Sequence, residues 1–389
     1  MKELSIYFEP LGEEYKTGQK EGKKLKFITD FHTENAFPDY EDADIAIFGV
    51  NEGRSGVVRS YAHTAPDHIR TFLYELYPGD VLPKVVDLGN IKAGNTIEDT
   101  YFAVQNVVEG LLERNLIPVI LGGTQDITYA NYKGYESREQ TVNLLTLDPE
   151  FDLGDVEGEL NSESYLGKIV LHQPNFLFNF SNIGYQRYFV DKSIIELMEG
   201  LYFDLHRLGE IRSDVKHAEP VIRNADIISI DMASVRNSDA PGAVKSSPHG
   251  FYGEEICQMT RYAGMSDKLS SIGIYNYDPK EDKNGQTAHL IAQMIWHFFE
   301  GFYARKKDFP LGKKDDYIKY RVNIKNLEHE LVFFKSPKSD RWWIEVPYPP
   351  DKRLKFERHC MIPCRYEDYE LSLKEELPDI WWKTYKKLS

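Results

Sequence analysis

The sequence predicts an α/β fold in three layers, with a mainly parallel sheet between two layers of helices and a small aromatic-rich C-terminal extension. Short apolar runs alternate with amphipathic helical segments along residues 44–304. Such runs are typical of parallel strands that are buried on both faces, and their alternation with helices favours a sheet covered on both sides. The 389 residues suffice for one domain of about 250–300 residues and an appendage.

Each predicted element has a local signal. The apolar runs predict strands over residues 45–50, 85–88, 117–121, 142–146, 182–185, 225–231 and 271–275. Helices are predicted to begin at Pro66 and after Thr96, and to cover residues 254–263 and 286–304. Thr96 is the expected N-cap, with Asp99 at the third helical position. The core face of that helix is predicted to carry Phe102, Val104, Val107, Val108, Leu111 and Leu112.

The composition divides the chain near Lys306. Residues 1–305 are predicted to form the main α/β domain, in which residues 1–40 are an irregular N-terminal segment. Residues 306–389 are predicted to form an extension that consists of a hairpin and a short helix, because a turn at residues 336–340 joins two apolar runs. So short a segment cannot bury a generous core of its own. We therefore expect it to dock onto the main domain or onto a protein partner.

Charge and cysteine content exclude several classes of protein. The formal net charge of -15 argues against a nucleic-acid binder and against a binder of anionic membranes. No apolar run approaches the length of a membrane span, and no signal-peptide pattern follows Met1. Three cysteines make no disulfide framework. A cytoplasmic location is therefore expected.

Carboxylates gather where two predicted strands end. Asp148, Glu150 and Asp152 stand at alternating positions just after one apolar run, and Asp231 ends another. In an open α/β sheet, ligands bind beyond the carboxyl ends of the strands. Carboxylates that converge there need a cation or hydrogen-bond donors to compensate them. The sequence therefore predicts a site at this edge of the sheet.

These strand ends resemble the ureohydrolase superfamily of arginase, agmatinase and especially formimidoylglutamase, over roughly residues 40–305. Residues 122–126 (Gly-Gly-Thr-Gln-Asp) are similar to the family's Gly-Gly-Asp-His-Ser, and residues 148–152 stand in the place of its Asp-Ala-His-x-Asp. Residues 229–233 take the place of Ser-x-Asp-x-Asp. Glu255, after residues 247–251, resembles a glutamate on the substrate side. The resemblance implies an arginase-like fold.

The resemblance also implies a dinuclear manganese site, whose bridging hydroxide attacks the carbon of a guanidino or formimino group. Asp148, Asp152 and Asp231 keep the family's residue type at their positions. The other three former metal positions differ: Gln125 and Glu150 replace the two histidines, and Ala233 replaces an aspartate. Oxygen ligands alone favour manganese, magnesium or calcium. The expectation is therefore one divalent cation at most.

The catalytic surroundings are altered as well. The family's proton-shuttle histidine has no counterpart in residues 161–165, where Glu163 stands instead. His249 and Glu255 are further candidates for a catalytic role, and none of the three is a firm assignment. If no metal binds, the carboxylates need another source of positive charge. The candidates for this compensation are Arg187, Arg236 and Lys245.

Two functions remain open from the sequence. The first is a family relative that has lost the standard reaction and acts as a binding or scaffolding protein, with residues 306–389 available to a protein partner. The second is an active C–N hydrolase of linear amidines that uses a modified, oxygen-rich metal site. Both allow a small guanidino or formimino ligand. The resemblance further implies a homo-oligomer, since the family commonly forms trimers or hexamers.

Overall fold

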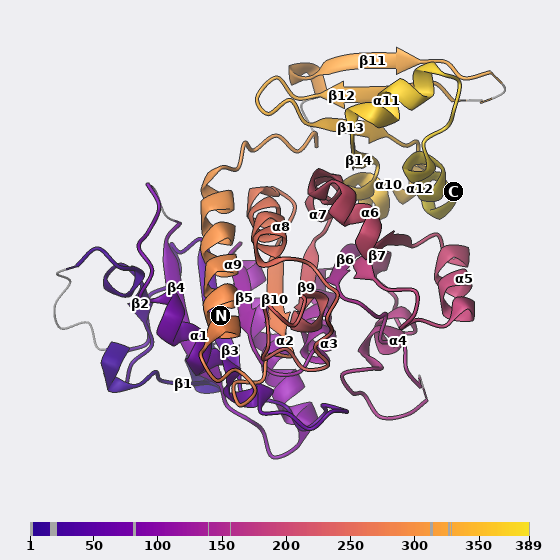
Figure 1. The fold of residues 1–389 in the computed structure, drawn as a ribbon. Coiled ribbons are helices and arrows are strands. Elements are labelled where there is room, and N and C mark those ends of the chain that lie inside the picture. Colours follow the sequence, from indigo (N-terminus) through magenta and orange to yellow (C-terminus); the bar gives the residue numbers. More distant parts are fainter. Residues whose placement is uncertain are drawn as a thin grey trace.

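A ten-stranded sheet with helices on both faces makes up the main domain among the residues that the computed structural model describes (Figure 1). Those residues are 3–15, 22–80, 83–138, 140–155, 157–311, 314–325, 327 and 329–388. The strands are β1 (Phe8–Glu9), β2 (Asp30–Phe31), β3 (Ile45–Val50), β4 (Val85–Ile91), β5 (Ile117–Leu121), β6 (Val142–Leu147), β7 (Leu177–Tyr185), β8 (Asp204–Arg207), β9 (Ile227–Asp231) and β10 (Ser271–Tyr275).

The sheet is almost entirely parallel. The strand order is β1-β4-β3-β5-β10-β9-β6-β7-β8, and β2 also pairs with β4. Within the described residues, β1 is the strand that pairs antiparallel. Successive side chains of β3 point to opposite cores, with Ile47 in one and Phe48 in the other. Burial on both faces is the reason that these strands have continuous apolar sequences. The predicted three-layer α/β fold is confirmed.

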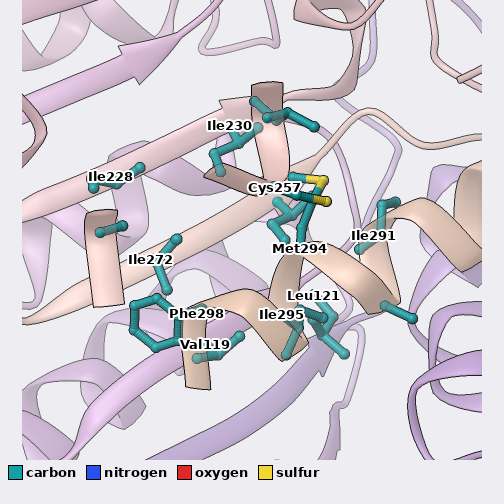
Figure 2. Close-up of a cluster of buried hydrophobic side chains, with 14 of the residues drawn as sticks. Val119, Leu121, Ile228, Ile230, Cys257, Ile272, Ile291, Met294, Ile295 and Phe298 are labelled. Carbon is teal, nitrogen blue, oxygen red and sulfur yellow. The ribbon is translucent and has the colours of Figure 1, made fainter. Parts of the chain in front are cut away.

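Helices cover each face of the sheet. One layer contains α1 (Ala65–Leu73), α6 (Leu208–Ser213), α7 (Ala218–Arg223), α8 (Gly253–Met265) and α9 (Gln286–Tyr303). The other contains α2 (Ile97–Glu113), α3 (Ile127–Lys133), α4 (Tyr165–Val170) and α5 (Lys192–Gly200). Figure 2 shows how α8 and α9 pack on the central strands, with Met294 and Phe298 over Ile228 and Ile272. The wide apolar stripe of α9 is therefore core packing.

The N-terminus of α2 has the predicted capping box: the Thr96 side chain accepts from Asp99 N, and the Asp99 side chain accepts from Thr96 N. The prediction for Phe102 was wrong, because its side chain is 61% exposed. Phe102 precedes Val104 by two residues, which is about 200° around the helix axis. It therefore points away from the stripe that meets the sheet.

The C-terminal extension contains more than the predicted hairpin and short helix. It forms a four-stranded antiparallel sheet in the order β11-β12-β13-β14. The strands are β11 (Ile318–Val322), β12 (Leu331–Lys335), β13 (Trp342–Glu345) and β14 (Met361–Cys364), and the helices are α10 (Arg353–Phe356), α11 (Tyr366–Leu373) and α12 (Asp379–Leu388). The predicted hairpin is β12 and β13, with Phe334 opposite Trp343. The additional strands cover its edges, as an isolated hairpin requires.

The extension lies against α7 (Figure 1) and against the edge of the sheet where β6 and β9 begin, as the contacts of Thr141 and Asp226 show. The Arg223 guanidinium lies 4.5 Å from the ring centre of Trp343. Arg358 Nη2 is 2.6 Å from Asp226 Oδ1, which belongs to the main domain. These contacts hold the two parts together by charge as well as by packing. Within the part of the chain that the structure describes, no helix combines the length and apolar character needed to cross a membrane.

Candidate functional site

The strand order brings the predicted site residues together. In the sheet, β5, β10, β9 and β6 are neighbours, and Leu147 of β6 pairs with Ile230 of β9. Asp148 and Asp231, which come directly after these two residues, therefore lie side by side at the carboxyl edge. This edge is where ligands bind in open α/β sheets.

Hydrogen bonds orient the two central aspartates. Asp231 Oδ1 accepts from Ala233 N at 2.7 Å, and its Oδ2 accepts from Asn276 Nδ2 at 2.8 Å. Asp148 Oδ1 accepts from Glu150 N at 2.8 Å. Asp148 Oδ2 and Gln125 Oε1 are buried and have no hydrogen-bond partner at ordinary distance among the described residues. The cluster thus retains oxygen atoms that ordered water, a proton or a cation could satisfy.

Burial and mutual repulsion make ionisation of the aspartates costly. Burial, together with the charges of Asp152 and Asp231, raises the pKa of Asp148 well above its usual value. Burial and the charges of Asp231 and Glu150 do the same to the pKa of Asp152. Burial raises the pKa of Asp231 to about 7 despite its two hydrogen bonds. These groups consequently hold protons more readily than ordinary carboxyls, or else they need a positive charge close by.

Lys245 supplies such a charge. Its Nζ lies 2.6 Å from Glu163 Oε1 and 3.7 Å from Glu150 Oε1. The charges of Glu150, Glu163 and Asp152 help to raise the pKa of Lys245, against the effect of burial. The ammonium is therefore held in its charged form between the loop after β6 and the segment before α4.

A small cavity marks the site. Its described lining includes Asp148, Glu150, Asp152, Glu163, Asp231, Ala233, Lys245 and Asn276. The volume open to the centre of a water-sized sphere is about 20 Å³, which is room for about one water molecule. The carboxyl end of the sheet is therefore nearly closed in this conformation.

Four of the predicted residues lie elsewhere. Arg236 Nε binds Asp239 Oδ1 at 2.9 Å, and its guanidinium stacks on Tyr252. Arg187 is exposed and does not line the cavity. Neither arginine lines the cavity, and Asp239 and Tyr252 hold the Arg236 side chain instead.

His249 and Glu255 are likewise outside the cavity. His249 is exposed, and its backbone carbonyl accepts from Gln186 Nε2 at 3.3 Å. Glu255 accepts from Tyr252 N at 2.8 Å in the capping box of α8 and pairs with Arg212 Nε at 3.3 Å. The Glu255 carboxylate thus caps the N-terminus of α8. Of the three catalytic candidates, Glu163 is the one that lines the cavity.

Asn276 and Tyr165 belong to the site but were not predicted from the sequence. Asn276 follows β10, and it links Asp231 to the backbone N of Gln125, which donates to Asn276 Oδ1 at 3.2 Å. The signal was available, since Asn276 follows an apolar run just as Asp148 does. Tyr165 is buried behind the cluster, and burial together with the charges of Asp148 and Asp152 raises its pKa. No local pattern distinguishes this tyrosine from a core residue.

The donor set does not fit a dinuclear manganese centre. Gln125, Glu150 and Ala233 leave it without imidazole nitrogen and without one carboxylate. In this conformation, with Lys245 beside Glu150 and Glu163, no three His, Cys, Asp or Glu side chains across the described ranges are arranged to hold a metal ion. Both oxygens of Asp231 already accept hydrogen bonds. On the correspondence that the resemblance implies, the residues present do not match the ligand set of a manganese pair.

Comparison with known proteins identifies a family. The model described as "Arginase family" matches residues 43–300. The formimidoylglutamase of Bacillus subtilis (strain 168) is 24% identical over 279 residues, which cover 66% of this chain and 86% of that protein. The formimidoylglutamase of Streptococcus gordonii is 27% identical over 269 residues, covering 64% and 79%.

Solved structures have the same fold. The formiminoglutamase of Trypanosoma cruzi with Mn²⁺ superposes with a TM-score of 0.65 at 21% identity, covering 72% of this chain and 99% of that one. The formimidoylglutamase of Bacillus subtilis superposes with a TM-score of 0.66 at 20% identity, covering 75% and 96%. The unmatched part of this chain is large enough to include its C-terminal extension.

Proposed function

This chain belongs to the arginase family, and we propose that it lacks the dinuclear-manganese ureohydrolase reaction and acts as a binding or scaffolding protein. The observation that carries the proposal is the content of the strand-end site. Three aspartates remain there, while Gln125, Glu150 and Ala233 stand at the other former ligand positions. The Lys245 ammonium lies beside the carboxylates.

The chemistry of the family needs what this site lacks. Hydrolysis of an amidine requires a hydroxide at neutral pH, which two metal ions supply by lowering the pKa of bound water. Without imidazole ligands and without a carboxylate at residue 233, the second metal has no adequate ligand set. The cavity of about 20 Å³ also has no room for an amidine group in this conformation. These observations therefore favour a binding or scaffolding protein over an active hydrolase.

A separate cleft supports a role in binding. It has a volume of about 580 Å³ and lies between the main domain and the extension, within the range of about 300–1,000 Å³ typical of ligand sites. The main domain contributes Asp204 and His206 to its lining, and the extension contributes Leu377 and Lys383. The extension also exposes Trp382, which is 41% accessible. The extension thus offers both a cleft and an aromatic contact to a partner.

Metal content and turnover test the loss of the reaction. The purified full-length protein is analysed for metals and then assayed for release of urea, formamide or ammonia from guanidino and formimino compounds with added Mn²⁺. We expect far less than one metal ion per chain and no turnover. About two manganese ions per chain together with turnover would contradict the proposal.

The scaffolding role needs a test of its own. The full-length protein and its Trp382→Ala variant are used to capture partners from a lysate of the source cells. A partner retained by the parent protein and lost from the variant supports binding through the extension. Identical partner lists for the two proteins would count against it.

The alternative is an active C–N hydrolase of linear amidines with a modified, oxygen-rich metal site. The unpartnered oxygens of Asp148 and Gln125 favour it, because both are buried and both are acceptable ligands for a hard cation. The assay above separates the two functions. One divalent ion per chain with metal-dependent turnover would support the hydrolase.

A further inference from the structure

Lys245 stands where a cation is needed most. We propose that its ammonium group takes the place of a metal ion. The ammonium partly neutralises the carboxylates at the strand ends and keeps divalent ions out of the site. The inference rests on the proposed loss of metal chemistry, and it names the residue that maintains this loss. It assigns to one side chain a role that the family's ligand pattern does not contain.

The position of the ammonium joins two loops. Glu150 belongs to the loop after β6, and Glu163 belongs to the segment before α4. Lys245 Nζ is 2.6 Å from Glu163 and 3.7 Å from Glu150. One ammonium therefore closes the side of the cavity between these segments. Both side chains of the 2.6 Å pair are 37% exposed, so solvent screens part of this attraction.

The loop that presents Lys245 is anchored at several points. Val244 N donates to the Asn276 carbonyl at 2.8 Å, and Gly242 N donates to Thr287 Oγ1 at 2.9 Å. Ala243 forms a β-bridge with Tyr277. Lys245 itself has a φ of +56°, a conformation that residues with a Cβ adopt only at a cost and when their surroundings hold them. The loop therefore places the ammonium against Glu150 and Glu163, while 37% of the Lys245 side chain stays exposed.

The charge balance of the cavity needs this ammonium. Among the described lining residues there are five carboxylates, namely Asp148, Glu150, Asp152, Glu163 and Asp231, and Lys245 is the one cationic side chain. An incoming divalent ion would therefore meet the like charge of an ammonium that already contacts Glu150 and Glu163. Exclusion of metal follows from this repulsion and from the occupied carboxylates.

The decisive experiment replaces Lys245 with methionine, which keeps the length and apolar stem of the side chain and removes its charge. Binding of MnCl₂ to the full-length parent and to Lys245→Met is measured by titration calorimetry and by elemental analysis after gel filtration. We expect Lys245→Met to bind about one Mn²⁺ per chain, at least about tenfold more tightly than the parent. Mn²⁺ should also raise the melting temperature of this variant and leave that of the parent unchanged.

Two control variants isolate the charge at residue 245. Lys245→Arg keeps a cation at the position and is expected to remain free of Mn²⁺. Lys335→Met removes a lysine that pairs with Asp340 at 2.8 Å in the extension, and it is expected to behave as the parent does. If Lys245→Met does not fold, Lys245→Gln replaces it, because the glutamine amide can still donate to Glu163.

The outcomes separate this inference from the proposed function. A neutral variant at residue 245 that binds Mn²⁺ no better than a metal-free parent would overturn the role of Lys245 and leave the loss of metal chemistry standing. Tight Mn²⁺ binding by Lys245→Arg would also overturn it. A parent protein that itself holds two manganese ions and turns over substrate would contradict the proposed function.

Discussion

Asp226 ties the C-terminal extension to the main domain, and its replacement by asparagine tests how firmly the extension is docked. Its Oδ1 is 2.6 Å from Arg358 Nη2, and its Oδ2 is 3.8 Å from Lys268 Nζ and accepts from Asn143 N at 2.8 Å. Asp226→Asn keeps the size and the hydrogen bond of the side chain. It removes the charge and leaves two cations without their anion.

The magnitude follows from burial. Removing one partner of a buried ion pair costs about 3–5 kcal/mol. Asp226 is fully buried and Lys268 nearly so, but the Arg358 side chain is 31% exposed and can be hydrated again. We therefore expect Asp226→Asn to lower the free energy of unfolding by about 3 kcal/mol, the lower end of this range. For 389 residues the entropy of unfolding is about 0.8 kcal/mol/K, so the melting temperature should fall by about 4 °C.

Tryptophan fluorescence is the suitable assay, because residues 342, 343, 381 and 382 are tryptophans of the extension and one other, Trp296, lies outside it. Thermal unfolding of Asp226→Asn should show the shift by fluorescence. The control is Glu330→Gln, which breaks an exposed pair with Arg321 and should cost less than about 1 kcal/mol. A shift in Asp226→Asn no larger than that of this control would refute the reasoning.

Other predictions concern pH and metal. Burial lowers the pKa of His359 well below its usual value, so the unfolded chain takes up a proton at this residue at a higher pH than the folded chain does. His359 should therefore cost no stability above about pH 6.5, and below it the free energy of unfolding should fall by up to about 1.4 kcal/mol per pH unit. Urea unfolding between about pH 7.5 and about pH 5 should show a weaker dependence of this free energy on pH for His359→Gln than for the parent protein. Restoring the family's ligands by Gln125→His, Glu150→His and Ala233→Asp should yield about two Mn²⁺ per chain by elemental analysis only when Lys245→Met is added. Equal metal content with and without that fourth change would contradict the prediction.

Much of the fold was predictable because the signals are local. The runs at residues 45–50 and 117–121 are apolar at nearly every position, which marks strands buried on both faces. Asp148 and Asp231 follow two such runs, so their meeting at one edge follows from the parallel sheet itself. The helix face at Phe102 was assigned incorrectly, since an apolar residue at a helix start does not reveal which way the helix is rotated.

The extension was predictable only in part. The turn at residues 336–340 is a local signal and identified the hairpin of β12 and β13. Strands β11 and β14 join the two edges of that hairpin across longer connections, which have no turn signal comparable to that of residues 336–340. Their place in the sheet required the tertiary structure.

The sequence by itself determined the class of fold, the family, and the three aspartates at the carboxyl edge, because strand patterns and residue types are written along the chain. It did not determine which charged group faces them. Arg236 is closer in sequence to Asp231 than Lys245 is, yet Asp239 and Tyr252 hold it elsewhere. The backbone path of a loop determines which charged groups a long side chain on that loop can reach. That path is decided by remote hydrogen bonds such as the one from Val244 N to Asn276, and only the folded structure shows them.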